Sequence, residues 1–151
     1  LKLYSEELQF NYLNLILFDS YGAGDWRNKL LPTIRKSLLS GESLRLSDPK
    51  ISINLSHIYD IVYGALAASV FTETDPKEKT YFLPGDEIEL GELISLVEKI
   101  INKTLPIEWH KFELPKKHII NPWVGITLPG WKREVKLWDG LNSYLNKNLR
   151  N

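Results

Sequence analysis

Hydrophobic and polar positions separate sharply near the start of the chain. Residues 13–18 read L-N-L-I-L-F, and the polar stretch D-S-Y-G-A-G-D follows at residues 19–25. A short apolar run that ends in turn-forming residues is typical of a strand buried on both faces of a sheet. We therefore expect a core strand over residues 13–18 and a polar loop at its carboxyl end.

That loop has two interpretations. In open α/β sheets, ligands bind just beyond the carboxyl ends of the strands, which makes residues 19–25 a candidate edge of a ligand site. Polar turns also follow many strands that have no ligand nearby. Composition leaves both interpretations open.

Five segments carry apolar residues at the three- and four-residue spacing of amphipathic helices. They are Leu1–Phe10, Trp26–Ser40, a helix that opens at Ser56 or His57, a helix through Leu93 and Ile101, and a terminal helix from Leu137 to Leu145. Gly41 is expected to end the second helix. The third helix carries an apolar stripe made of Ile58, Ile61, Val62, Ala65, Leu66 and Val70.

Three other segments alternate apolar and polar residues, as half-buried strands do. They are residues 43–46, 51–56 and 106–112, and a short strand is also expected at residues 81–83. Residues 114–130 contain three prolines and little periodicity, which predicts irregular structure. Because strands and helices mostly alternate along the chain, we predict the α/β fold class.

Composition narrows the classes of function. The chain has 151 residues, 43% hydrophobic and 25% charged, as is typical of one globular domain. Lys plus Arg number 19 and Asp plus Glu number 19, so nothing points to nucleic acid or an anionic membrane as a partner. No apolar run approaches the roughly 20 residues of a membrane helix, and there is no cysteine. We therefore expect a cytoplasmic protein without disulfides.

Few side chains are obvious candidates for catalysis, metal binding or anion binding. The three histidines share no metal-ligand spacing, and we expect no metal site. Asp19 could act as a base or bind a hydroxyl group. Arg27 and Lys29 come near the start of the second helix, where backbone amides and the helix dipole favour a phosphate group. A solvated basic helix end explains these two residues equally well.

Two tryptophans, Trp123 and Trp131, flank part of the irregular segment. Such residues stack on a ligand or pin a loop to the core. We favour the second role for Trp131. The sequence also begins at Leu1 and contains no methionine, so we expect a fragment, a cleaved product or a sequence that lacks modified methionines.

Four blocks of sequence resemble the extended short-chain dehydrogenase/reductases that act on nucleotide sugars. The first, L-F-D-S-Y-G-A-G-D, is similar to the strand-to-loop motif of that family, and S-H-I-Y-D-I-V is similar to its F-V-H-V-D-D-V segment. The other two blocks include K-L-L-P, which lies between these two, and L-P-G-W-K, which comes after them. All four blocks stand in the family's order. The blocks cover residues 17–25, 29–32 with 40–44, 56–62, and 128–132 with 137–141.

This resemblance implies the C-terminal portion of an NAD(P)-binding Rossmann-like fold with its small substrate-binding domain. Residues 1–25 would end the Rossmann-like core, and residues 26–151 would form mainly the substrate-binding part. The wording of residues 18–25 is closest to the CDP-abequose synthase-like 4-ketoreductases, which reduce the C4 ketone of a nucleotide sugar with NAD or NADP. Nucleotide-sugar 4-epimerases and dehydratases are sister enzymes, and the resemblance suggests a homodimer.

The resemblance also implies roles for individual residues. Phe18 would lie near the nicotinamide of the cofactor. Lys29 would lie beside the substrate's diphosphate, and residues 44–46 would run past the nucleotide base. The substrate-binding set that it implies is Asp19, Lys29, Leu30, Leu44, Arg45 and Leu46. His57 and Asp60 would shape the turn into the third helix, and Trp131 and Gly140 would be structural.

The chain departs from the family in two respects. It contains neither the glycine-rich dinucleotide loop nor the catalytic Y-x-x-x-K, so we expect no catalytic residue in it and no activity from it alone. Ile53 stands where several relatives carry an arginine that grips the diphosphate. Three possibilities remain: the substrate-binding part of a reductase, epimerase or dehydratase, a non-catalytic module that binds nucleotide sugars, or a decayed relative that binds no ligand.

Overall fold

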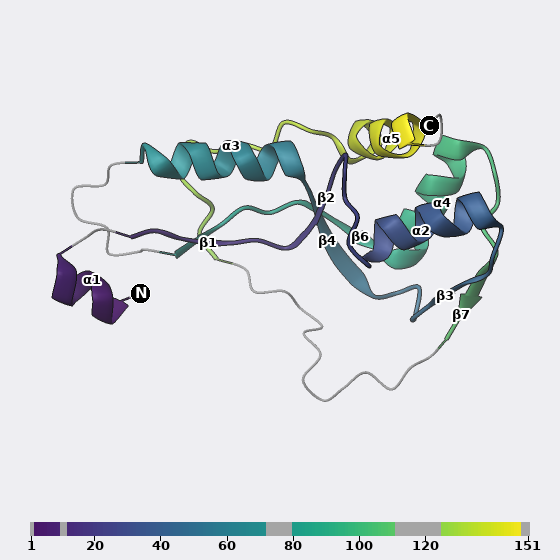
Figure 1. Cartoon of the computed structure of the whole chain (residues 1–151), viewed down its shortest axis with the longest axis horizontal. Coiled ribbons are helices and arrows are strands. Elements are labelled where there is room, and N and C mark those ends of the chain that lie inside the picture. The colour runs from purple at the N-terminus through teal and green to yellow at the C-terminus, as the bar shows by residue number, and fades with distance from the viewer. Residues whose placement is uncertain (1, 10–11, 72–79, 111–124, 149–151) are drawn as a thin grey trace.

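The computed structural model describes residues 2–9, 12–71, 80–110 and 125–148, in which single strands or pairs of strands alternate with helices (Figure 1). The described helices are α1 (Lys2–Leu8), α2 (Leu30–Ser40), α3 (Ile58–Ser69), α4 (Leu90–Ile101) and α5 (Leu137–Asn148). The described strands are β1 (Asn14–Ile16), β2 (Asp19–Tyr21), β3 (Leu44–Leu46), β4 (Ser52–His57), β5 (Thr80–Phe82), β6 (Asp86–Glu89) and β7 (Ile107–Trp109). The predicted α/β class is confirmed.

Within the apolar run at residues 13–18, Asn14–Ile16 form a strand, but the prediction that it is buried on both faces is wrong. β1 pairs in parallel with β5, and every residue of β1 is only partly buried. Leu17, just beyond the strand, is 47% exposed. Among the described residues β5 is the one strand paired with β1, which leaves the other edge of β1 without a neighbouring strand.

The polar stretch predicted as a loop begins with a strand. β2 pairs in parallel with one edge of β4, and β6 pairs antiparallel with the other edge. The sequence pattern revealed neither β2 nor β6, because backbone hydrogen bonds to β4 hold them and their own side chains are largely polar. The loop itself starts at Gly22, and Gly24 takes a left-handed conformation with φ of 80°.

The second helix begins later than predicted and ends where predicted. Residues 27–29 bend, and Lys29 has an extended backbone with φ of −115° and ψ of 172° before α2 starts at Leu30. At the other end Gly41 is left-handed, with φ of 73°, and its N–H donates to the Ser37 carbonyl over 2.8 Å. This is the usual glycine ending of a helix.

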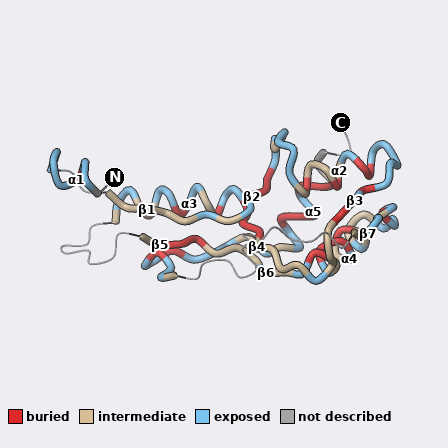
Figure 2. The backbone as a smooth tube through the Cα atoms, turned by 90° about the horizontal axis from the view of Figure 1, so that it is seen from below, coloured by how far each residue is buried: buried red, intermediate tan, exposed pale blue. Residues whose placement is uncertain are grey.

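Most buried apolar side chains gather at the end of the molecule that contains α2, α4 and α5 (Figure 2). This large core comprises Tyr21, Leu31, Ile34, Leu38, Leu44, Leu46, Leu55, Leu90, Leu93, Ile94, Val97, Leu105, Leu141, Tyr144 and Leu145. A smaller core, made of Tyr81, Leu83, Leu128 and Trp131, lies against β1 and α3. Leu15, Ala67 and Ala68 pack onto the smaller core.

The apolar stripe of α3 mostly faces outward. The helix starts after His57, as predicted, and its buried residues are Asp60 and Gly64. The exposed large side chains of α3 and its C-cap, between 39% and 75% exposed, are Ile58, Tyr59, Val62, Tyr63, Leu66 and Val70. None of the described helices has both the length and the apolar content needed to cross a bilayer.

Candidate functional site

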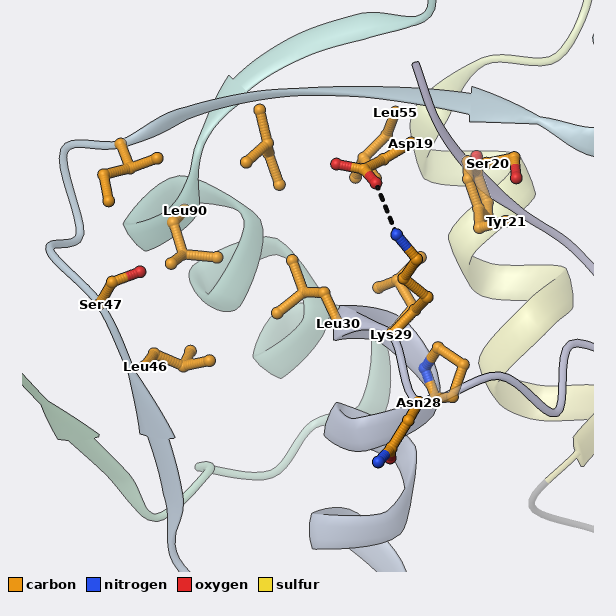
Figure 3. Close-up of a pocket in the computed structure, with 14 residues that line it drawn as sticks. Asp19, Ser20, Tyr21, Asn28, Lys29, Leu30, Leu46, Ser47, Leu55 and Leu90 are labelled. Carbon is orange, nitrogen blue, oxygen red and sulfur yellow. Dashed lines mark ion pairs between the residues drawn. The ribbon is translucent and has the colours of Figure 1, made fainter. Parts of the chain in front are cut away.

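A cavity of about 370 Å³ lies where β2 and β4 meet the start of α2 (Figure 3). It is lined by Asp19, Ser20, Tyr21, Asn28, Lys29, Leu30, Leu31, Pro32, Leu46, Ser47, Ile51, Ile53, Leu55 and Leu90. The lining joins three parts of the sequence: residues 19–32, residues 46–55 and the first residue of α4. The parallel pairing of β2 with β4 brings the first two parts together.

Two oppositely charged side chains face each other in this cavity. Asp19 is the first residue of β2, and its Oδ1 lies 3.7 Å from Nζ of Lys29, the residue that precedes α2 (Figure 3). Both side chains are 57% exposed. A long ion pair between two solvated side chains contributes little to stability, so it can open when a ligand offers either partner a better contact.

The start of α2 adds a second cationic feature to the same place. Lys29 occupies the N-cap position, and no side chain accepts a hydrogen bond there. The first amide groups of a helix carry partial positive charge and commonly bind phosphate or carboxylate groups. The cavity therefore offers an anion the ammonium group of Lys29 beside a helix N-terminus.

The rest of the wall is largely apolar. Leucine and isoleucine side chains from α2, β3, β4, the segment before β4 and α4 contribute Leu30, Leu46, Ile51, Ile53, Leu55 and Leu90. Ser20, Asn28 and Ser47 supply neutral hydrogen-bonding groups. Such a site fits a ligand with a flat or apolar portion and one anionic group, which is the usual pattern of a small-molecule pocket.

The structure gathers four of the predicted substrate-binding residues around this cavity, namely Asp19, Lys29, Leu30 and Leu46. Leu44 instead belongs to the large core. Arg45 lies between two buried residues of β3 but is itself exposed, and its Nε pairs with Glu108 Oε2 over 3.1 Å. Phe18 is not in the lining, and its ring packs edge-on against Phe82 with centroids 6.2 Å apart.

Arg27, the other basic residue near the start of α2, is engaged in the loop. Its Nε contacts Asp25 Oδ1 over 2.8 Å, and its Nη2 donates to the carbonyl of Ser20 over 3.0 Å. The hydrogen bond from Arg27 holds the pKa of Asp25 below its usual value. Arg27 therefore closes the G-A-G-D loop, and Lys29 is the cation that faces the cavity.

Residues predicted to be structural hold the start of α3 and the segment that precedes α5. His57 Nδ1 accepts the N–H of Tyr59 over 3.3 Å and caps α3. Buried Asp60 accepts the N–H groups of Glu134 and Val135 over 2.9 and 3.3 Å. The indole N–H of Trp131 donates to the Asp60 carbonyl over 3.0 Å, so the predicted pinning role of Trp131 is confirmed.

Tyr21 and Gly140 form the contact between β2 and α5. The Tyr21 ring is buried, and burial is the main reason why its pKa lies far above the usual value, so its hydroxyl stays protonated. A side chain at Gly140 would collide with that hydroxyl, which confirms the structural role predicted for this glycine. Trp123 lies outside the described residues.

The sequence alone did not reveal several lining residues. Ser47, Ile51 and Leu55 flank or occupy predicted strands but carried no chemical signal of their own. Leu90 could not be predicted as a lining residue because β6, the strand that directly precedes it, was not predicted. The parts of the chain that the structure describes contain no group of three or more histidine, aspartate or glutamate side chains placed to hold a metal ion.

Comparison with curated proteins gives a partial match. Over 98 residues the chain is 30% identical to CDP-abequose synthase from Yersinia pseudotuberculosis. The match covers 64% of this chain and 34% of that protein. No family model matches the chain.

Solved structures match nearly the whole chain. A UDP-glucuronic acid 4-epimerase mutant from Bacillus cereus, in complex with UDP-4-deoxy-4-fluoro-glucuronic acid and NAD, superposes with a TM-score of 0.84 at 22% identity, covering 98% of this chain and 49% of that one. DesIV, a dTDP-glucose 4,6-dehydratase from Streptomyces venezuelae with NAD bound, gives 0.81 at 18% identity, covering 99% and 47%. A UDP-N-acetylglucosamine 4-epimerase from Methanobrevibacter ruminantium M1, in complex with UDP-N-acetylmuramic acid, gives 0.81 at 13% identity, covering 99% and 49%.

These likenesses show a fold. The chain has the α/β architecture of about half of an extended short-chain dehydrogenase/reductase of the nucleotide-sugar epimerase and dehydratase type. It spans about half the length of these solved structures and 34% of the curated relative.

Proposed function

We propose that this chain is the substrate-binding half of an NAD(P)-dependent nucleotide-sugar 4-ketoreductase similar to CDP-abequose synthase. The main support is the cavity in which an apolar wall meets Lys29 and a helix N-terminus, in a chain that is 30% identical to CDP-abequose synthase over 98 residues. In this proposal residues 1–25 end a Rossmann-like core, residues 26–151 form mainly the substrate-binding part, and the protein acts in the cytoplasm as a homodimer.

Each part of the cavity has a role in this proposal. Lys29 and the first turn of α2, which starts at Leu30, bind the diphosphate, and Asp19 accepts a hydrogen bond from a sugar hydroxyl. The apolar wall, with Leu46, receives the base and the deoxygenated carbon of the sugar. Leu44 and Arg45 belong to the strand that passes the base; Leu44 supports it from the core.

The cofactor meets this chain at one place in the proposal. Phe18 ends the segment that leads from β1 to the cavity. In this proposal it borders the nicotinamide, as the family resemblance implies. Arg27 closes the G-A-G-D loop between β2 and α2. In this proposal the phosphates of the dinucleotide are therefore bound by a part of the protein outside this chain. When bound, NAD or NADP supplies the hydride, and the residues of this chain bind and orient the sugar.

The outer face of α3 supports the view that a second half exists. Helix α3 carries six large exposed apolar or aromatic side chains on itself and its C-cap, and its single charged residue, Asp60, is buried. A contiguous apolar surface of this kind normally marks an interface. We place the cofactor-binding half on this face and on the edge of β1 that no described strand covers.

Two measurements test the proposed function. Isothermal calorimetry of the 151-residue chain with CDP-, dTDP- and UDP-sugars should show binding, and Lys29→Gln should weaken it. An assay of the same chain with NADPH and a 4-keto nucleotide sugar should show no turnover. Turnover by this chain alone, or the absence of any nucleotide-sugar binding, would contradict the proposal.

An alternative is a nucleotide-sugar 4-epimerase or 4,6-dehydratase, and the solved structures favour it because all those compared above are proteins of these two kinds.

A second alternative is a non-catalytic module that binds nucleotide sugars. The coding sequence upstream of Leu1 would distinguish an enzyme from such a binding module. A glycine-rich strand–turn–helix followed by Y-x-x-x-K would support an enzyme. With the upstream part expressed, product analysis by NMR distinguishes reduction at C4 from inversion or loss of water.

A further inference from the structure

The cavity is lined by one acidic and one basic side chain. Of the residues that line it, Asp19 and Lys29 alone carry a full charge, and they carry opposite ones. Their side chains already face each other over 3.7 Å, as the dashed line in Figure 3 shows. The lining therefore has no net charge, although its one cation lies beside a helix N-terminus.

A bound anion would meet both members of this pair. Its attraction to Lys29 is opposed by repulsion from Asp19, because a carboxylate within a few ångströms of the ammonium lies almost as close to any anion bound there. An anion that takes Lys29 also deprives Asp19 of its partner. The carboxylate is then satisfied by water or by a hydrogen-bond donor on the ligand, such as a hydroxyl group.

We infer that Asp19 is a specificity-determining residue, a counter-charge that lowers the affinity of the cavity for bare anions and favours ligands with a hydroxyl group next to the anion. The inference rests on the proposed nucleotide-sugar site and states what that site discriminates against: inorganic pyrophosphate and nucleoside diphosphates without a sugar. Such ligands satisfy Lys29 but leave the Asp19 carboxylate facing a negative charge. A nucleotide sugar satisfies both side chains.

Asp19→Asn is a clean probe of this role. Asparagine has nearly the same shape, keeps an oxygen that accepts a hydrogen bond and removes the charge. The side chain is 57% exposed, so the fold does not depend on it. Glu42→Gln is the matched control, because Glu42 is exposed, lies outside the lining and follows the far end of the helix that Lys29 precedes.

The experiment measures the affinity of the full 151-residue chain for inorganic pyrophosphate, CDP and CDP-glucose by calorimetry at low ionic strength. Removing one charge a few ångströms from a partly solvated anion changes its affinity by about three- to tenfold. We expect Asp19→Asn to bind pyrophosphate and CDP more tightly by that factor. The gain for CDP-glucose should be smaller, because its sugar loses a charged acceptor. Glu42→Gln should leave all three affinities unchanged.

Several results would overturn the inference. They are an unchanged or lower pyrophosphate affinity in Asp19→Asn, an equal gain in Glu42→Gln, an equal gain for all three ligands, or no anion binding by either protein. Failure of the proposed function gives a different result. If Asp19→Asn gains affinity for pyrophosphate and CDP while CDP-glucose binds no protein tested, the counter-charge role stands and the nucleotide-sugar assignment falls.

Discussion

The two ends of the molecule differ in how many apolar side chains they bury. At the cavity end, α2, α4 and α5 enclose a core of fifteen buried residues among those described, with Ile34, Leu93 and Leu141 fully shielded from solvent. At the α3 end, the corresponding core has four members, and α3 exposes more large apolar side chains than it buries (Figure 2).

This difference indicates which part of the chain supplies its own folding free energy. The free energy of burying apolar surface grows with the area removed from water, so the cavity end supplies most of the folding free energy. The outer face of α3 supplies none while it is exposed. A partner bound to that face would stabilise the α3 end selectively.

The largest expected effect tests this asymmetry with two leucines that both lie in helices. Leu93 in α4 has no exposed surface, and Leu93→Ala should cost about 2–5 kcal/mol of unfolding free energy through lost burial and a cavity. Leu66 in α3 is 60% exposed, and Leu66→Ala should change the free energy by less than about 0.5 kcal/mol. Urea unfolding followed by circular dichroism measures both. Similar losses in the two variants would refute the comparison.

The next effect concerns the hydrogen bonds between α3 and the segment that precedes α5. Asp60 in α3 accepts the backbone N–H groups of Glu134 and Val135, which lead into α5. Asp60→Ala removes a charged acceptor from two partly buried donors and should cost about 2–3 kcal/mol. Asp60→Asn keeps one acceptor oxygen and should cost less. Urea unfolding that ranks the two variants equally would show that the carboxylate does not carry the contact.

How far the sequence could predict these two ends follows from what holds each segment. The helices, β3, β4 and the caps at Gly41 and His57 follow from side-chain periodicity and turn chemistry, and the structure has them. β2 and β6 escaped because backbone pairing with β4 holds them and their polar side chains give no apolar signal.

The outward direction of the α3 stripe also escaped prediction, since periodicity shows that a helix has an apolar face but not what lies against it. The same limit applies to the candidate site. Asp19 and Lys29 could be named from the resemblance, but their 3.7 Å ion pair depends on the pairing of β2 with β4 and on the late start of α2.

A smaller effect examines packing where α3 is covered. A Cβ atom added at Gly64 would lie within 3.1 Å of both Leu83 and the indole nitrogen of Trp131. Gly64→Ala gains about 1 kcal/mol in helix propensity, but overpacking costs about 1–3 kcal/mol, so a net loss of about 1 kcal/mol is expected in urea unfolding. Ala65→Gly, at the exposed neighbouring position, calibrates the propensity difference. A net gain in Gly64→Ala would mean that this core is loosely packed.

The smallest effect is a pH dependence at the junction of β4 and α3. Burial holds the pKa of His57 below its usual value, and the charge of Asp60 opposes this shift. A histidine with a lower pKa in the folded state than in the unfolded state binds fewer protons when folded. Its contribution is therefore complete above the unfolded pKa of about 6.5 and is lost as the pH falls below it. Protonation also removes the Nδ1 acceptor that caps α3.

His57→Asn isolates this contribution, because asparagine is a good N-cap residue and does not titrate. The pKa of Asp86 is raised by burial, so its contribution falls as the pH rises, in the opposite direction to that of His57. Both proteins contain Asp86, and the difference between them cancels it. The urea midpoint of the wild-type chain should fall more between pH 7.5 and pH 5 than that of the variant. The additional loss of helical signal should come from α3 alone. Parallel pH profiles would show that His57 does not couple protonation to the α3 end.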